Sequence, residues 1–291
     1  MIVVETLQWD HHPSLKAPIM LCAFEGWTDA GGAASSAATY LADHWRAREF
    51  AAIDAEEFYD FTSLRPQVRL TSEGNRRILW PQNRFLAASG PSDHDVVFLI
   101  GIEPHLRWRA FTDCVTTVAS SLGVQAVFTL GAMLTDVTHT RATPVRGSTA
   151  DKRLAERFQM ARPQYQGPTG IVGVLQDAFG SVDIPVGSLM AQVPHYVPRT
   201  PSPKATLALV DRVCELLTAH VSTSSLLLAS AAYEREVSEF VASDDDIASY
   251  VRQLEDRSED EGSVTPEAEI PSGDALAAEL ERFLREQGDA N

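Results

Sequence analysis

The segment Ile19–Gly32 constrains the fold more than any other part of the chain, because an apolar run ends there in a glycine-flanked acidic turn before an alanine-rich stretch. The apolar residues Ile19–Phe24 are typical of a strand buried on both faces. A helix is expected from about Ala33, and in open α/β sheets the ligand crevice lies at the carboxyl ends of the strands. Five residues of the turn are therefore candidate site residues: Glu25, Gly26, Trp27, Thr28 and Asp29.

The order of strand, polar turn and helix recurs along the chain, which predicts an α/β fold with a mixed, mostly parallel sheet. Further strands are expected at Val96–Ile100, Val124–Leu130 and Val186–Val193. Helices with apolar residues at helical spacing are expected at 32–46, 107–122 and 203–220.

Between the first helix and the strand at Val96 the pattern breaks into short strand-like pieces, at 57–61, 68–71, 77–80 and 84–87. Ser72-Glu73-Gly74-Asn75 has the composition of a hairpin turn. We therefore expect a hairpin insertion over about residues 57–87. Such a hairpin either packs against its own domain or forms an oligomer contact, and the sequence leaves both open.

Polar side chains follow each of the other predicted strands as well. Because the carboxyl ends of neighbouring parallel strands meet at one edge, these side chains are expected to line one mixed-charge, aromatic rim. A single loop His or Asp is usually a turn or capping residue, so the prediction depends on their conjunction. The remaining candidates for a small-ligand cleft at this rim are Glu103, His105, Trp108, Asp136, His139, Arg141, His195 and Tyr196.

No complete catalytic motif is present. The turn matches neither G-x-G-x-x-G nor the Walker pattern, and its two carboxylates would repel a phosphate. The chain also lacks a G-x-S-x-G nucleophile elbow and an H-E-x-x-H metal motif. We therefore assign no catalytic residue, no metal and no cofactor. Asp29 has a structural role available too, since it precedes a helix that it can cap.

The charge distribution bears on partners. The formal net charge is −16, and residues 234–291 hold 18 acidic and 5 basic residues, so the excess acidity is C-terminal. A nearly neutral body without a basic stripe argues against nucleic acid. The apolar runs are too short to span a bilayer and no secretory leader is recognisable, so we expect a cytoplasmic protein without a membrane partner. Cys22, Cys114 and Cys214 are expected to be buried thiols.

After an α/β core over residues 1–222, the sequence predicts a C-terminal helical region over 223–291. Helices are expected at 224–241 and 244–257, an acidic linker at about 258–273, and a last helix from Asp274. The apolar stripe of this last helix must be buried. It packs on its own core, docks on a partner or covers the rim as a lid, and all three stay open.

Several short segments carry a further signal when they are taken together. They are Phe24-Glu25-Gly26-Trp27-Thr28-Asp29-Ala30-Gly31, Gly101-Ile102-Glu103-Pro104 with Trp108, Leu130-Gly131-Ala132, His139-Thr140-Arg141, Gln166-Gly167-Pro168-Thr169-Gly170, Val193-Pro194-His195-Tyr196 and Pro203-Lys204-Ala205. In this combination the chain resembles, over about residues 1–220, the bacterial branch of the proteasome assembly chaperone 2 (PAC2) family. The resemblance implies a three-layer α/β core similar to purine nucleoside phosphorylases and peptidyl-tRNA hydrolases, with a hairpin insertion and a C-terminal helical region.

The resemblance implies protein interaction and no established reaction, because eukaryotic relatives act as assembly chaperones for the proteasome α-ring. A C-terminal hydrophobic-Tyr-X tail is a docking device of relatives that bind proteasome rings, whereas this chain ends Gly288-Asp289-Ala290-Asn291. We do not expect docking by that device, although another surface could supply it. We expect a protein partner or a homo-oligomer, of which a trimer is one form.

Three hypotheses about function follow from these observations, of which one is a ligand-binding regulator without turnover. The first is a non-catalytic interaction protein, similar to an assembly chaperone, with a small-ligand cleft at the rim. The alternative is a hydrolase or phosphorylase-like enzyme that acts on a small polar metabolite and uses the C-terminal helices as a lid. Whether the predicted loops meet in one pocket bears on all three.

Overall fold

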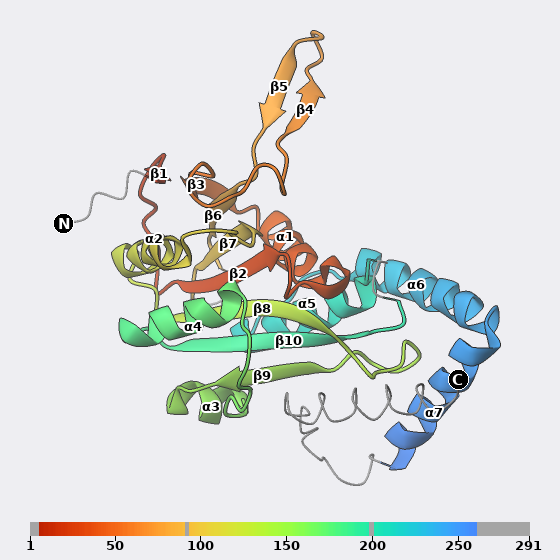
Figure 1. Cartoon of the computed structure of the whole chain (residues 1–291). Helices are drawn as coiled ribbons and strands as arrows, with labels where there is room; N and C mark the ends of the chain where they lie inside the picture. The colour runs from red at the N-terminus through yellow and green to blue at the C-terminus, as the bar shows by residue number, and fades with distance from the viewer. Residues whose placement is uncertain (1–5, 91–92, 198–200, 261–291) are drawn as a thin grey trace, which may run out of the picture.

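The computed structural model describes residues 6–90, 93–197 and 201–260, and Figure 1 shows their arrangement. Eight strands form one sheet in the order β1-β3-β6-β7-β2-β8-β10-β9, and β4 pairs with β5 separately. The strands are β1 (Leu7–Trp9), β2 (Ile19–Glu25), β3 (Arg48–Ile53), β4 (Gln67–Leu70), β5 (Arg76–Leu79), β6 (Asn83–Ala88), β7 (Val96–Ile102), β8 (Ala126–Thr135), β9 (Val145–Thr149) and β10 (Val186–Pro194). The helices are α1 (Ala33–His44), α2 (Trp108–Ser121), α3 (Lys152–Phe158), α4 (Ile171–Ser181), α5 (Pro203–Leu217), α6 (Ser224–Ala242) and α7 (Asp245–Asp260), with a 3-10 turn η1 (Ala30–Gly32) before α1.

The middle of the sheet is parallel and its edges are antiparallel. β2 pairs in parallel with β7 and β8, and β8 pairs in parallel with β10. Beyond β7 the strands β6, β3 and β1 continue the sheet in antiparallel pairs, as β9 does beyond β10. The predicted mixed α/β sheet is confirmed. The apolar run Ile19–Phe24 is buried along its whole length, as the central strand of such a sheet requires.

Helices cover both faces of the sheet, so the core has two halves (Figure 1). On one face α1 and α5 pack around Leu21 and Phe128, and on the other α2 and α4 pack around Met20 and Phe85. Met20 and Leu21 point to opposite faces because successive side chains of a strand alternate. The three predicted buried cysteines are confirmed: Cys22, Cys114 and Cys214 are buried and unbridged.

The hairpin of β4 and β5 projects from the rest of the molecule (Figure 1). Its turn lies where the sequence predicts it: the Thr71 N–H donates to the Asn75 carbonyl at 2.8 Å, and Gly74 has a φ of 82°. A strand at 57–61 is also predicted, and this prediction is wrong. The segment forms turns in which Phe58 and Tyr59 are buried, so its apolar pattern reflects packing against the sheet.

The C-terminal helices α6 and α7 agree with the two helices predicted there. Tyr233 and Val237 of α6 pack with Val251 of α7 in a small apolar cluster apart from the two halves of the core. Leu227 and Leu228, which the sequence places among the apolar residues of α6, are exposed. The acidic linker from residue 261 and the predicted last helix lie outside the described residues. Within the described residues no helix is long and apolar enough to cross a membrane.

Candidate functional site

The predicted loops lie at one edge of the sheet. β7, β2, β8 and β10 are neighbours that run in the same direction, so their carboxyl ends meet there. Contacts gather the side chains of these loops into two clusters. The first surrounds Glu103, beside the turn after β2, and the second surrounds His139, beside the loop after β10 and the helices α5 and α6.

Glu103 holds two other segments by their backbone. One carboxylate oxygen accepts the N–H of Trp27 at 3.0 Å, and the other accepts the N–H of Ile171 at 2.8 Å. Ile171 is the first residue of α4, where the helix dipole favours a negative charge. The Glu103 N–H donates in turn to the Glu25 carbonyl at 2.8 Å. Glu103 therefore ties the turn after β2 and the start of α4 to the end of β7.

Two glycines make room for this carboxylate. A Cβ on Gly26 would lie 2.8 Å from the Cβ of Glu103, and Gly26 has a φ of +147° that other residues rarely adopt. A Cβ on Gly170 would lie 2.6 Å from the Glu103 Oε1. Three of the short segments that stand out in the sequence, at 24–31, 101–104 and 166–170, thus meet at one structural junction.

The rest of the turn after β2 is also hydrogen-bonded to other parts of the fold. The Asp29 carboxylate accepts the N–H groups of Ala34 at 2.7 Å and Ser35 at 3.2 Å, and the Ser35 hydroxyl at 2.5 Å. The predicted capping role is confirmed. Burial raises the pKa of Asp29, while these hydrogen bonds act in the opposite direction. The Thr28 carbonyl accepts the Ala132 N–H at 2.7 Å, which joins the turn to β8.

The surface beside Glu25 is hollowed into an open depression of about 300 Å³. Two of its residues hold neighbouring backbone: His105 Nδ1 accepts the Asp60 N–H at 3.2 Å, and Trp108 Nε1 donates to the Pro104 carbonyl at 2.6 Å. The depression is lined by Glu25, Gly26, Ile102, Glu103, Pro104, His105 and Trp108. Five of the predicted cleft residues therefore share one shallow surface.

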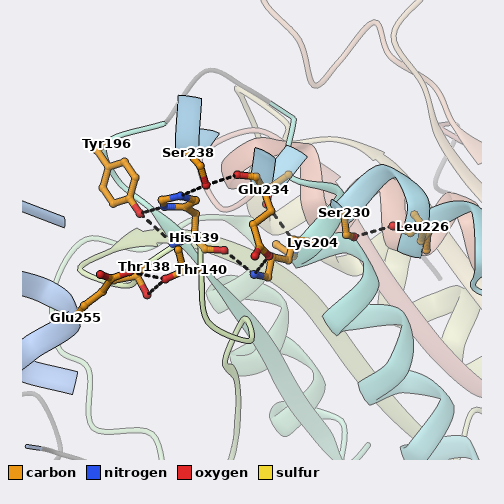
Figure 2. Close-up of polar contacts among 12 residues, drawn as sticks. Thr138, His139, Thr140, Tyr196, Lys204, Leu226, Ser230, Glu234, Ser238 and Glu255 are labelled. Carbon is orange, nitrogen blue, oxygen red and sulfur yellow. Dashed lines mark hydrogen bonds and ion pairs between the residues drawn. The ribbon is translucent and has the colours of Figure 1, made fainter. Parts of the chain in front are cut away.

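Figure 2 shows the second cluster, in which the buried His139 ring lies between Tyr196 and Ser238. The Tyr196 oxygen is 2.7 Å from His139 Nδ1, and it also accepts the His139 N–H at 2.9 Å. His139 Nε2 is 3.0 Å from the Ser238 oxygen, and the Ser238 hydroxyl donates to the Glu234 carbonyl at 2.7 Å. His139 thus joins the loop after β8 to the loop after β10 and to α6.

These contacts assign a neutral imidazole. Because the Tyr196 oxygen already accepts a backbone N–H, its hydroxyl hydrogen is available to donate to Nδ1, which leaves Nε2–H to donate to Ser238. Burial lowers the pKa of His139, and the Lys204 ammonium also lowers it, while the carboxylates of Glu234 and Glu255 act to raise it. Burial raises the pKa of Tyr196 to about 12. Both side chains are therefore uncharged near neutral pH.

An ion pair closes the cluster on the side of α5. The Lys204 ammonium donates to the His139 carbonyl at 2.5 Å and to the Glu234 carboxylate at 2.6 Å (Figure 2). The Lys204 side chain is only 15% exposed, so its charge needs this partner. Lys204, Glu234 and Ser238 are missing from the predicted site. Lys204 lies in the segment Pro203-Lys204-Ala205 noted in the sequence. Glu234 and Ser238 lie in a predicted helix, and the sequence gives no further sign that they contact His139 or Lys204.

The remaining predicted residues attach α7. His195 Nδ1 and the Tyr250 hydroxyl both lie 3.3 Å from the Asp136 carboxylate. Thr140 donates to the Glu255 side chain at 2.7 Å, and Arg141 donates to the Glu255 carbonyl at 3.3 Å. Asp136, His139, Arg141, His195 and Tyr196 therefore lie in contacts that hold α6 and α7, and their role as ligand contacts stays a prediction.

The polar side chains of these two clusters mainly hold parts of the fold in position. Within the described residues no group of three His, Cys, Asp or Glu side chains is arranged to hold a metal ion. Glu103, Asp29 and His139 each bind backbone or neighbouring side chains of the fold. Their polar atoms therefore stabilise loop positions, and the Ser238 hydroxyl beside His139 donates to the Glu234 carbonyl.

Exposed apolar side chains share the rim with these structural residues. Trp27 in the turn after β2 is 64% exposed, and Leu106 after β7 is 50% exposed. Met133 and Leu134 at the end of β8 and Tyr165 before α4 are exposed too. Large apolar side chains gathered at one edge are typical of a surface that binds protein.

The comparisons with known proteins agree with this arrangement. The model of the PAC2 family matches residues 23–241. A PAC2 family protein from Streptomyces avermitilis is 43% identical, with a TM-score of 0.76 over 80% of this chain and 99% of that chain. A proteasome-assembly chaperone homologue from Mycobacterium tuberculosis is 42% identical, with a TM-score of 0.72 over the same shares.

More distant structures share the fold alone. PbaB from Pyrococcus furiosus, an archaeal proteasome activator, is 15% identical, with a TM-score of 0.66 over 81% of this chain and 98% of that chain. No curated protein matches the chain.

Proposed function

The chain belongs to the PAC2 family, and from this premise we propose that it is a non-catalytic, assembly-chaperone-like protein that binds another protein at the rim. The observation that carries the proposal is the exposure of Trp27 and Leu106 beside polar groups already bound within the fold. A partner that covered these two side chains would bury apolar area without disturbing the hydrogen bonds beneath them.

The named relatives indicate the class of partner. One is a proteasome-assembly chaperone homologue and another is a proteasome activator. We propose proteasome α-subunits as the partner of this chain, met in the cytoplasm where newly made subunits assemble. We further propose self-association, and a division into a core over residues 1–222 and a helical region over 223–291. The predicted cleft residues stay predictions as ligand contacts.

The test measures binding of the full chain to purified α-subunits, and to assembled proteasome core particles, from the same organism by calorimetry. The double variant Trp27→Ser with Leu106→Ser is expected to weaken binding at least about tenfold. The matched control is Val182→Ser, since Val182 is also exposed but lies before β10, away from the rim. Its binding is expected to equal that of the unmodified chain.

Three results would contradict the proposal. Absence of binding to either probe would remove the partner. An equal loss in the Val182 control would remove the rim as the binding surface. Turnover in a screen of small polar metabolites, abolished by Glu25→Gln or His139→Ala without a fall in melting temperature, would establish the enzyme alternative instead.

A further inference from the structure

The β4–β5 hairpin, residues 67–79, is an exposed arm. Every residue of β4 and the first three residues of β5 are exposed, and Figure 1 shows the arm standing clear of the sheet. A two-stranded hairpin is at best marginally stable in water unless a further surface packs on it. Next to the base of the arm, the Trp80 ring meets the Phe61 ring at 5.0 Å. The outer part of the arm therefore exposes a surface on which another protein surface can pack.

The two faces of the arm differ in chemistry. The register pairs Val68 with Ile78 and Leu70 with Arg76, so these four side chains share one face. Leu70 is 71% exposed, and the two paired residues Val68 and Ile78 are each nearly half exposed. This face is an apolar patch with one arginine at its outer end.

The other face carries an unfavourable pair. Arg69 lies directly opposite Arg77, and like charges in this position destabilise a hairpin. Residues 67–79 hold three arginines and one glutamate, in a protein whose net charge is −16. A partner with acidic groups beside an apolar patch would both bury the apolar face and reduce this repulsion.

The outer face of α6 has this chemistry. Leu228, Ala232, Glu236 and Phe240 follow one another at four-residue spacing and form one row along α6, and Asp244 follows just after the helix ends. Leu228 is 75% exposed, Phe240 is 46% exposed, and both acidic residues are exposed. Along α6 itself Glu234, Glu236 and Glu239 outnumber the single Arg235, so the helix is complementary in charge to the arm. Figure 1 shows α6 away from the arm of its own chain.

We propose that the arm of one copy docks on the outer face of α6 in a second copy of this chain. Val68, Leu70 and Ile78 pack against Phe240, and Arg76 lies beside Glu236, one helical turn away. Two arms do not pair with each other, because both are basic. The contact joins two different surfaces, so each copy gives one arm and receives another, and copies related by rotation close into a ring.

The first test measures the mass of the full chain by light scattering on a sizing column. The unmodified chain is expected to be an oligomer. Leu70→Ser with Arg76→Glu is expected to shift the mass to that of a monomer, as is Glu236→Arg with Phe240→Ser. The matched control, Arg109→Glu with Arg153→Glu, changes two exposed arginines on other helices and is expected to keep the oligomer. A monomeric unmodified chain, or an oligomer that survives both interface variants, overturns the proposal.

The second test distinguishes this contact from pairing of two arms. The native cysteines are buried, so Leu70→Cys and Phe240→Cys each introduce one accessible thiol. With a bismaleimide, cross-linked dimers are expected only when the two single variants are mixed. Dimers from Leu70→Cys alone, or none from the mixture, overturn the proposal. Neither test uses a proteasome subunit, so its outcome is independent of the proposed function at the rim.

Discussion

Glu103 lies at a surface rim, and both of its carboxylate oxygens accept N–H groups from other segments. An acceptor placed in this way stabilises loops whose own backbone has no partner in a helix or sheet. The same applies to Asp29 at the start of α1. At these positions the charge is part of the architecture of the rim, and the side chains available to a partner are the apolar ones beside it.

Removing the Glu103 carboxylate should therefore act on stability. We expect Glu103→Ala to lower the free energy of unfolding by about 2 to 3 kcal/mol, because two backbone N–H groups lose a charged acceptor. Urea denaturation measures this change. The control Glu156→Ala, an exposed residue of α3, should stay within about 0.5 kcal/mol. Equal effects in the two variants would show that Glu103 does not hold the loops.

Gly26, which lies beside Glu103, is also expected to tolerate no larger residue. Gly26→Ala should cost at least about 2 kcal/mol, since it combines a φ of +147° with a Cβ 2.8 Å from Glu103. Gly180→Ala is the matched change, because nothing lies within 4 Å of a Cβ there and the residue is helical. It should leave stability unchanged or raise it by up to about 1 kcal/mol. Thermal melts of both variants measure these changes in stability. A Gly26→Ala variant as stable as the unmodified chain would contradict the close packing of Gly26 against Glu103.

Among the elements, α6 is attached to the core through His139, a titratable group whose pKa is lowered. Its Ser238 and Glu234 contact His139 and Lys204 of the core. The neutral ring satisfies every donor and acceptor around it, whereas a proton on Nδ1 would place two donors against the Tyr196 oxygen. Protonation of His139 therefore weakens the contact between α6 and the loops after β8 and β10.

The expected pH dependence follows from the lowered pKa of His139. The unfolded chain binds the proton below about pH 6.5, whereas the folded chain does so only at lower pH. This contribution to stability is complete above pH 6.5 and is lost as the pH falls through the folded-state pKa. Denaturation between pH 8 and 5 should show a weaker pH dependence in His139→Gln, and an unaltered one in His44→Gln, an exposed residue of α1. Identical pH dependence in all three proteins would contradict the assignment.

The elements that the sequence predicts are those whose pattern is set by burial alone. β2, β7, β8 and β10 are apolar runs, and the alanine face of α1 is continuous. β3 begins with Arg48 and Glu49, and α4 contains Gly173 next to a glycine-rich loop, so neither has a clear period. The order of strands and loops puts these loops at one edge of the sheet, but the sequence does not show that Glu103 faces Ile171 or that His139 faces α6. These contacts join residues far apart in the chain and depend on tertiary packing.

On the scale of the whole molecule, the core does not depend on the arm. Replacing residues 68–78 by a short glycine-serine turn should change the free energy of unfolding of dilute protein by less than about 1 kcal/mol, because the arm buries little of its own surface. Phe85→Ala, in the buried strand β6, should cost about 3 to 5 kcal/mol under the same conditions. A large loss on removal of the arm would assign it to the core.

The position of β2 in the sheet also affects how the protein folds during its synthesis. This strand comes early in the chain, yet its neighbours come from much later: Ile19 pairs with Val96 on one side and with Ala126 on the other. A nascent chain must therefore extend past β8 before this buried strand is covered on both sides, and folds with such high contact order form slowly. During that interval Ile19–Phe24 is exposed on the ribosome, so we expect the nascent chain to bind the chaperones of the cell before it folds.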